Sequence, residues 1–136
     1  MMTAIMCLAL NIYFEARDQG FEGKLMVAEV TLNRVADPDF PDTVCEVVWQ
    51  PGAFSWTGDG KSDKPQDLEA FADAVLVAGD ALYTPEIMLG TKATYYHERS
   101  IHPYWASSVT MIGMVGNHIF YVKKEPQIKL VLAKRF

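Results

Sequence analysis

The feature that most constrains this chain is an apolar stripe near its N-terminus that ends in a carboxylate. Ile5, Leu8 and Ile12 recur at helical spacing, and Glu15 takes the next position on the same face. Such a stripe normally points into a core, where a carboxylic acid is either paired with a cation or kept protonated by desolvation. The pattern predicts a helix and leaves two interpretations of Glu15: a helix end salt-bridged to a surface Lys or Arg, or a proton donor in a cleft.

Length and composition favour one domain, residues 1–136, with a sizeable core. Half of the 136 residues are hydrophobic, and a chain of this length buries roughly two-thirds of the surface that it exposes when unfolded. The net charge is −5, and no run of Lys and Arg is longer than two residues. Because phosphate binding needs clustered positive charge, we expect no nucleic acid partner.

The apolar N-terminal segment is expected to be the first core helix. It lacks the positively charged start of a signal peptide and is too short to span a bilayer. We therefore expect no membrane span and synthesis in the cytoplasm, with any external target reached through another factor. A catalytic domain belonging to a longer exported protein is the alternative.

The two cysteines, Cys7 and Cys45, lie among apolar residues and outside any Cys-x-x-Cys pair. The default expectation is two buried free thiols in a reducing compartment. A disulfide between them stays open.

Helices are expected first along the chain and strands afterwards. The order of helices and then strands predicts an α+β fold with a small antiparallel sheet. A loop from 51 to 65 separates the early helices from the later one, and the tail from 127 to 136 could be a strand, a helix or a flexible end. Periodicity predicts helices over about 3–17, 22–35, 44–50 and 65–83, strands over 93–97, 109–112 and 118–122, and a turn at Gly116-Asn117.

Two of these helices have informative faces. The segment 22–35 is apolar on most sides, which predicts a central, buried helix. The segment 65–83 is expected to pack through Leu68, Phe71, Ala72, Val75, Leu76 and Leu82.

Aromatic residues beside polar groups suggest a sugar-binding cleft, because pyranose rings stack on aromatic faces while amides and hydroxyls bind their hydroxyl groups. For Trp56 and Trp105, filling the core is an equally good interpretation. His97 and His118 fall on strands expected to be adjacent and could meet, but no zinc-type spacing supports a metal site.

Six blocks in order, from Ala9 to Tyr121, resemble the SleB-like cell-wall hydrolases, the catalytic domains of spore-cortex-lytic enzymes and their relatives. The matching residues are Glu15-Ala16-Arg17 with Glu22-Gly23, Leu32-Asn33-Arg34-Val35, Phe40-Pro41-Asp42-Thr43-Val44, Gln50 with Phe54-Ser55, Tyr96-His97 with Pro103 and Trp105, and Gly116-Asn117-His118 with Phe120-Tyr121.

The resemblance implies a lysozyme-like fold and cleavage of peptidoglycan glycan strands as a lytic transglycosylase, with Glu15 as the catalytic acid. The apolar flank of Glu15 would raise its pKa. No cofactor or metal is expected, and we expect a monomer. The expected glycan-binding residues are Gln50, Phe54, Ser55, Tyr96, Trp105, His118 and Tyr121, with Glu22, Asn33 and Arg34 behind them.

One departure from the family pattern limits the chemistry. Gln19 stands where the family usually has Glu, so this position cannot supply an acid or base and is either substrate-binding or structural. A hydrolysing glycosidase usually needs two carboxylates, whereas a lytic transglycosylase can use one. The alternatives are a lysozyme-type muramidase, a glycan-binding module without catalysis, and a metal-dependent amidase using His97 and His118.

Overall fold

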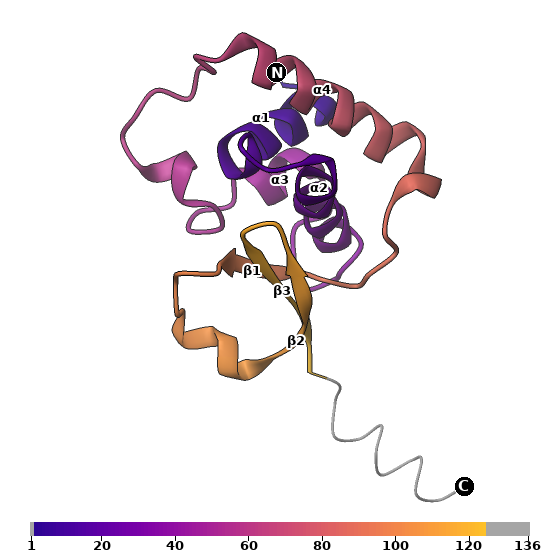
Figure 1. Ribbon diagram of the computed structural model, residues 1–136, viewed down its shortest axis with the longest axis vertical. Coiled ribbons are helices and arrows are strands. Elements are labelled where there is room, and N and C mark those ends of the chain that lie inside the picture. The colour runs from indigo at the N-terminus through magenta and orange to yellow at the C-terminus, as the bar shows by residue number, and fades with distance from the viewer. Residues whose placement is uncertain (1, 125–136) are drawn as a thin grey trace, which may run out of the picture.

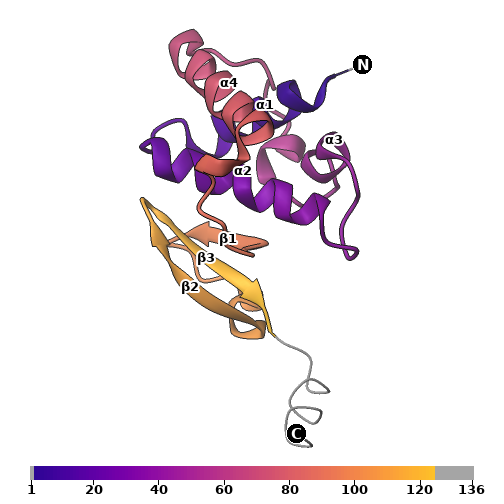
Figure 2. The ribbon, with the colours of Figure 1, turned by 90° about the vertical axis from the view of Figure 1, so that its right-hand side faces the viewer.

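The computed structural model describes residues 2–124, so the expected tail at 127–136 lies outside the described residues. A group of helices forms one part of the molecule, and a three-stranded sheet lies against α2 (Figures 1 and 2). No helix within 2–124 has the length and apolar character needed to cross a bilayer. The elements are α1 (Ala4–Ala16), α2 (Phe21–Val35), α3 (Val44–Val48), η1 (Ser55–Gly58), α4 (Leu68–Tyr83), η2 (Pro85–Ile87), β1 (Tyr95–Glu98), η3 (Tyr104–Ser108), β2 (Val109–Val115) and β3 (His118–Lys123).

The first two helices form as expected. The Thr3 side chain caps α1 by accepting a hydrogen bond of 3.3 Å from the Met6 N–H. The helix α2 is central: it is buried almost continuously from Gly23 to Thr31 and contacts both the other helices and the sheet. Its Met26 and Val30 pack against Phe120 of β3, which joins the sheet to the helical part.

The buried face of α4 differs from the expected one. The helix packs through Ala74, Val77, Ala78 and Ala81, whereas Leu68, Ala72 and Leu76 are exposed and Phe71, Val75 and Leu82 lie half-buried at the edge. The physical reason is close helix packing. A Cβ added to Gly79 would lie 3.7 Å from Ile5 Cδ1 of α1, so small side chains fit this seam better than leucines.

The expectation of two free thiols is wrong. Cys7 of α1 and Cys45 of α3 form a disulfide, with 5.3 Å between their Cα atoms. The pairing depends on how α3 packs beside α1, which no spacing in the sequence indicates.

The sheet is antiparallel with the strand order β1-β3-β2. The predicted turn at Gly116-Asn117 is confirmed between β2 and β3, and Gly116 has φ +58°. Residues of β1 and β3 alternate between two faces: Tyr96 and Phe120 face α2, while Tyr95 and Tyr121 face away.

Candidate functional site

Glu15 lies in the last turn of α1, at the end of the fully buried stripe of Leu8 and Ile12. Its Oε1 accepts a hydrogen bond from the Tyr96 hydroxyl of β1. The charge of Arg34, near the end of α2, also acts on this carboxylate. Within residues 2–124 Glu15 forms no ion pair, so the surface salt bridge is not the explanation of its position.

The surroundings of Glu15 favour its protonated form. Burial raises the pKa of Glu15 above its usual value, and the Tyr96 hydrogen bond and the Arg34 charge oppose this shift without cancelling it. Burial and the neighbouring Glu15 raise the pKa of Tyr96 well above its usual range, so the Tyr96 hydroxyl keeps its proton and remains a donor. This arrangement suits a general acid.

Arg34 is held among aromatic rings beside Glu15. Its Nε donates a hydrogen bond of 2.8 Å to the Thr94 carbonyl oxygen. Its guanidinium carbon lies 5.0 Å from the ring centroid of Phe40, 5.2 Å from that of Phe54 and 5.7 Å from that of Tyr95. Burial lowers the pKa of Arg34, but Tyr96, Tyr95 and Glu15 raise it, and the group stays charged.

An open hollow of about 300 Å³ lies over this cluster. Glu15 is not in its wall, but Tyr96 and Arg34, which both act on Glu15, are. Rings beside amide and carbonyl groups are the lining that a sugar-binding site needs. The hollow is lined by Arg34, Phe40, Gln50, Pro51, Gly52, Ala53, Tyr95, Tyr96 and Trp105.

The hollow gathers some of the expected glycan-binding residues and leaves others out. Gln50, Tyr96 and Trp105 line it. Phe54 is buried beneath Arg34, so it supports the hollow from inside. Ser55 is exposed at the start of η1, outside the wall.

The last two expected glycan-binding residues lie on opposite faces of the sheet, and neither lines the hollow. His118 is buried on the face toward α2, with its ring centroid 5.0 Å from that of Tyr96, and burial lowers its pKa against the charges of Glu98 and Asp18. Tyr121 is buried on the other face, 5.5 Å from Trp105 between ring centroids. Both can support rings of the hollow without lining it.

His97 and His118 do not meet, although β1 and β3 pair as expected. His97 pairs with Ile119 and His118 with Glu98, so the two side chains point to opposite faces. The Nδ1 of His97 lies 2.7 Å from the Glu98 carbonyl, to which it donates, and its Nε2 lies 2.7 Å from the Tyr121 hydroxyl. Within 2–124 no group of three His, Cys, Asp or Glu side chains is arranged to hold a metal ion.

Trp56, one of the two tryptophans with an open interpretation, belongs to the core. It is buried, stacks on Phe14, and donates a hydrogen bond of 2.8 Å from its indole nitrogen to Asn11 Oδ1. Asn11 is itself fully buried in α1 and also donates to the Thr31 hydroxyl. Trp56 therefore fixes the loop after α3 from inside.

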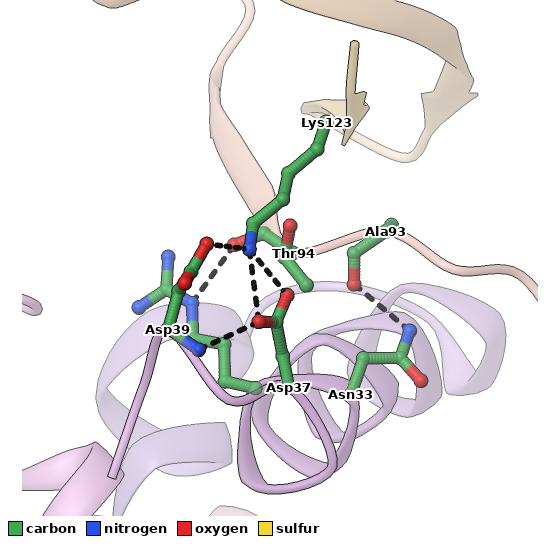
Figure 3. A network of polar contacts seen from close by, with 7 residues as sticks. Asn33, Asp37, Asp39, Ala93, Thr94 and Lys123 are labelled. Carbon is green, nitrogen blue, oxygen red and sulfur yellow. Dashed lines mark hydrogen bonds and ion pairs between the residues drawn. The ribbon is translucent and has the colours of Figure 1, made fainter. Parts of the chain in front are cut away.

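The residues expected behind the glycan-binding set separate into two kinds. Asn33 and Arg34 hold the segment that leads into β1. Asn33 donates a 2.8 Å hydrogen bond to the Ala93 carbonyl (Figure 3) and one of 3.0 Å to the Thr91 carbonyl, and Arg34 donates to the Thr94 carbonyl. Glu22 is exposed in the first turn of α2 and makes no hydrogen bond or ion pair within the described residues. Its position is that of a charge favoured at a helix N-terminus.

The hydrogen bond of Gln19 favours a structural role for this position over a substrate-binding one. Its Oε1 accepts a hydrogen bond of 2.9 Å from the Asn117 N–H in the β2–β3 turn. The amide thus joins the α1–α2 connection to the sheet.

A buried carboxylate on α2 was not among the predicted site residues. Glu29 accepts hydrogen bonds from the Gly90 N–H at 3.0 Å, the Thr91 N–H at 2.8 Å and the Thr91 hydroxyl. An acid within the helix predicted to be apolar on most sides is the sequence signal that could have found it. Here it anchors the chain ahead of β1.

A second polar network joins the end of the sheet to the helical part. Lys123 of β3 reaches Asp37, at 2.7 Å, and Asp39 in the loop after α2 (Figure 3). Lys123 Nζ also lies 5.5 Å from the ring centroid of Phe40, which lines the hollow, so the network ties the end of β3 to the loop after α2.

Comparison with known proteins gives one consistent family. A profile described as "Cell Wall Hydrolase" matches residues 18–121, and Glu15 lies just before that segment. The spore cortex-lytic enzyme of Oceanobacillus iheyensis is 34% identical over 124 residues, 85% of this chain and 40% of that protein. The enzyme of the same description from Halalkalibacterium halodurans is 38% identical over 117 residues, 85% of this chain and 34% of that protein. The chain thus spans well under half the length of these relatives.

Two solved structures are similar along nearly their whole length. The catalytic domain of the Bacillus cereus SleB protein has a TM-score of 0.69 at 31% identity, covering 87% of this chain and 88% of that one. The catalytic domain of the germination-specific lytic transglycosylase SleB from Bacillus anthracis has a TM-score of 0.68 at 30% identity, covering 87% and 93%. The expected α+β fold, with helices followed by a small antiparallel sheet, is confirmed.

Proposed function

This chain belongs to the cell wall hydrolase family, and from that premise we propose that it cleaves the glycan strands of peptidoglycan as a lytic transglycosylase. Its target is the β-1,4 bond between MurNAc and GlcNAc, and the product carries a 1,6-anhydro-MurNAc end. The names of its relatives, spore cortex-lytic enzyme and lytic transglycosylase, agree with this substrate class.

Glu15 is the catalytic acid of this proposal. The observation that carries it is a single carboxyl group, raised in pKa by burial and held by the Tyr96 hydroxyl, behind a hollow lined with aromatic rings. An acid with a raised pKa holds its proton until substrate arrives and can then release it.

The reaction needs one group that gives a proton and takes one back. Glu15 protonates the glycosidic oxygen as the bond from C1 of MurNAc to that oxygen breaks. The C6 hydroxyl of the same MurNAc then bonds to C1, and its proton passes to the Glu15 carboxylate. Glu15 ends as it began, and no water is consumed.

The neighbourhood of Glu15 supports a mechanism with one acid. Within residues 2–124 no second carboxylate hydrogen-bonds to Glu15 or Tyr96. Gln19, at the position where the family usually has Glu, is an amide that binds the Asn117 N–H. Arg34 and Tyr96 hold the carboxylate after it has lost its proton, because both favour its charged form.

Glycan binding is assigned to the hollow. Trp105, Tyr95 and Phe40 offer ring faces, and Gln50 offers amide hydrogen bonds. We further propose that the domain acts as a monomer on the cell wall, either released by another factor or as part of a longer exported protein.

The test is digestion of purified peptidoglycan followed by mass spectrometry of the released muropeptides. We expect products one water lighter than hydrolysis gives, and at least a hundredfold loss of activity in Glu15→Gln, on the order of a positioned acid's contribution. Glu22→Gln is the matched control and should keep its activity, since Glu22 is exposed.

Three outcomes would contradict the proposal. Reducing-end MurNAc would mean a lysozyme-type muramidase, which needs a second carboxylate. An active Glu15→Gln variant would exclude the acid assignment. Binding to peptidoglycan without loss of turbidity would mean a glycan-binding module.

A further inference from the structure

A covalent link joins two elements that build the candidate site. The chain has two cysteines, and they form one disulfide across 38 residues of sequence. Cys7 lies on α1, the helix that carries Glu15. Cys45 lies on α3, which leads directly into the wall of the hollow at 50–53. The ring closed by the disulfide also contains Arg34.

The helix α3 is held by a short set of buried side chains and by this bond. It is five residues long, and Thr43 caps it by accepting a hydrogen bond of 3.2 Å from the Glu46 N–H. Val47 and Val48 are fully buried against the core. A helix of this length is not stable by itself, so its position depends on its tertiary contacts and on the bond to α1.

The two cysteine residues differ in accessibility. Cys7 is 0% exposed, whereas Cys45 is half-buried. Thiol–disulfide exchange requires a thiolate to approach one sulfur along the bond. Cys45 is therefore the more accessible of the two cysteines, and its Sγ lies 3.5 Å from the Thr3 carbonyl oxygen and 3.7 Å from that of Met2.

We propose that Cys45 is a thiol–disulfide exchange site, and that the oxidation state of the Cys7–Cys45 pair controls how well the hollow binds glycan. A thiolate of a dithiol reductant attacks Cys45 Sγ, and the electron pair of the broken bond leaves on Cys7 Sγ, which takes up a proton. The second thiol of the reductant then displaces Cys45, so the reductant is oxidised to a disulfide and the protein becomes a dithiol. Exchange with a disulfide oxidant reverses both steps.

The reduced form loses the covalent restraint on α3 and on residues 50–53. Gln50 and its neighbours then sample more positions, and the hollow must be ordered again when glycan binds. Glu15, Tyr96 and Arg34 do not contact α3 in the hydrogen bonds that hold them, so the chemical step changes less. Reduction is expected to raise KM several-fold with a small change in kcat. This inference rests on the proposed function, because its readout is glycan cleavage.

The experiment compares KM and kcat on soluble glycan strands for the oxidised protein and for protein reduced with dithiothreitol. Both forms are assayed at a temperature well below the thermal unfolding midpoint of the reduced form. The control is the Cys7→Ala/Cys45→Ala variant, which should have the raised KM with and without reductant. Reoxidation with glutathione disulfide should restore the low KM of the wild type. If the double variant does not fold, the reduced wild type still gives the test.

An unchanged KM after complete reduction, checked by thiol titration, would overturn the proposal and leave the disulfide a purely structural link. Hydrogen exchange separates this failure from failure of the proposed function. If no form cleaves glycan, the proposed function fails. Faster amide hydrogen exchange at 44–53 on reduction would then still support control of this segment by the disulfide at Cys45, and unchanged hydrogen exchange would overturn that control.

Discussion

At the scale of single residues, Glu15 shows how the fold changes the proton affinity of one helix position. It stands at the end of an apolar stripe, and its burial in the folded protein raises the pKa of the carboxyl group. Tyr96 arrives from a strand 81 residues later and sets the direction of one oxygen. The pKa of Glu15 is therefore raised by burial and lowered in part by a residue that is distant in the sequence.

The Tyr96 hydrogen bond opposes the raised pKa of Glu15, which gives a prediction with a definite sign. In the proposed mechanism Glu15 must be protonated to act, so kcat/KM should fall as the pH rises through its pKa. Tyr96→Phe removes an interaction that stabilises the charged form. We expect the alkaline limb of the pH profile to move to higher pH, with a lower maximum rate. Tyr104→Phe, at a residue 93% exposed, should leave the limb in place; an alkaline limb moved to lower pH in Tyr96→Phe would contradict the role of Tyr96.

At the scale of elements, the β2–β3 turn is held from outside by the α1–α2 connection. Gly116 has φ +58°, and a Cβ added there would lie 2.1 Å from Gln19 Oε1. The Gln19 side chain can move aside, but its hydrogen bond to the Asn117 N–H would then break. Gly116 thus serves both the turn and the contact.

Gly116→Ala should therefore destabilise the protein by two separable effects. Backbone strain at positive φ costs about 1 kcal/mol, and loss of the Gln19 hydrogen bond costs about another 1 kcal/mol. In the Gln19→Ala background only the strain remains, so a double-mutant cycle in urea should give a coupling of about 1 kcal/mol. Gly60→Ala, with φ +76° and no atom within 4 Å, measures strain alone. If the effects of Gly116→Ala and Gln19→Ala on the free energy of unfolding were additive, the contact between the two residues would be excluded.

At the scale of the whole molecule, α2 joins the helical part to the sheet. Its Glu29, Asn33 and Arg34 all hydrogen-bond to residues 90–94, immediately ahead of β1. The apolar contacts of Met26 and Val30 lie beside them. Tyr96 reaches Glu15 only because this seam fixes where β1 begins.

Glu29→Ala should destabilise the protein by about 3 kcal/mol, because it leaves the Gly90 and Thr91 donors without their buried acceptor. Urea denaturation of wild type and variant measures this difference. Glu69→Ala, at an exposed residue in the first turn of α4, should change the free energy of unfolding by about 0.5 kcal/mol or less. Equal effects of the two substitutions would mean that the seam does not depend on Glu29.

Local pattern was enough for the elements and for the position of Glu15, whereas its expected role as an acid came from the resemblance to a family. Helical spacing placed Glu15 after Ile12, and the Gly116-Asn117 pair marked the turn between two strands. Each of these inferences depends on residues a few positions apart, where backbone geometry alone relates side chains. The α+β class followed from their order.

The sequence by itself determined which segments become helices and strands, and it placed one carboxyl group at the end of an apolar helix face without deciding whether that group is buried. Tertiary structure alone decided that Cys7 meets Cys45, that α4 packs through alanines, that His97 and His118 face apart, and that Tyr96 and Arg34 meet Glu15. The physical reason is the sequence distance over which a pattern can relate two residues. Periodicity fixes a side chain's direction about its own helix or strand, whereas its partner depends on how closely and in which register separate elements pack.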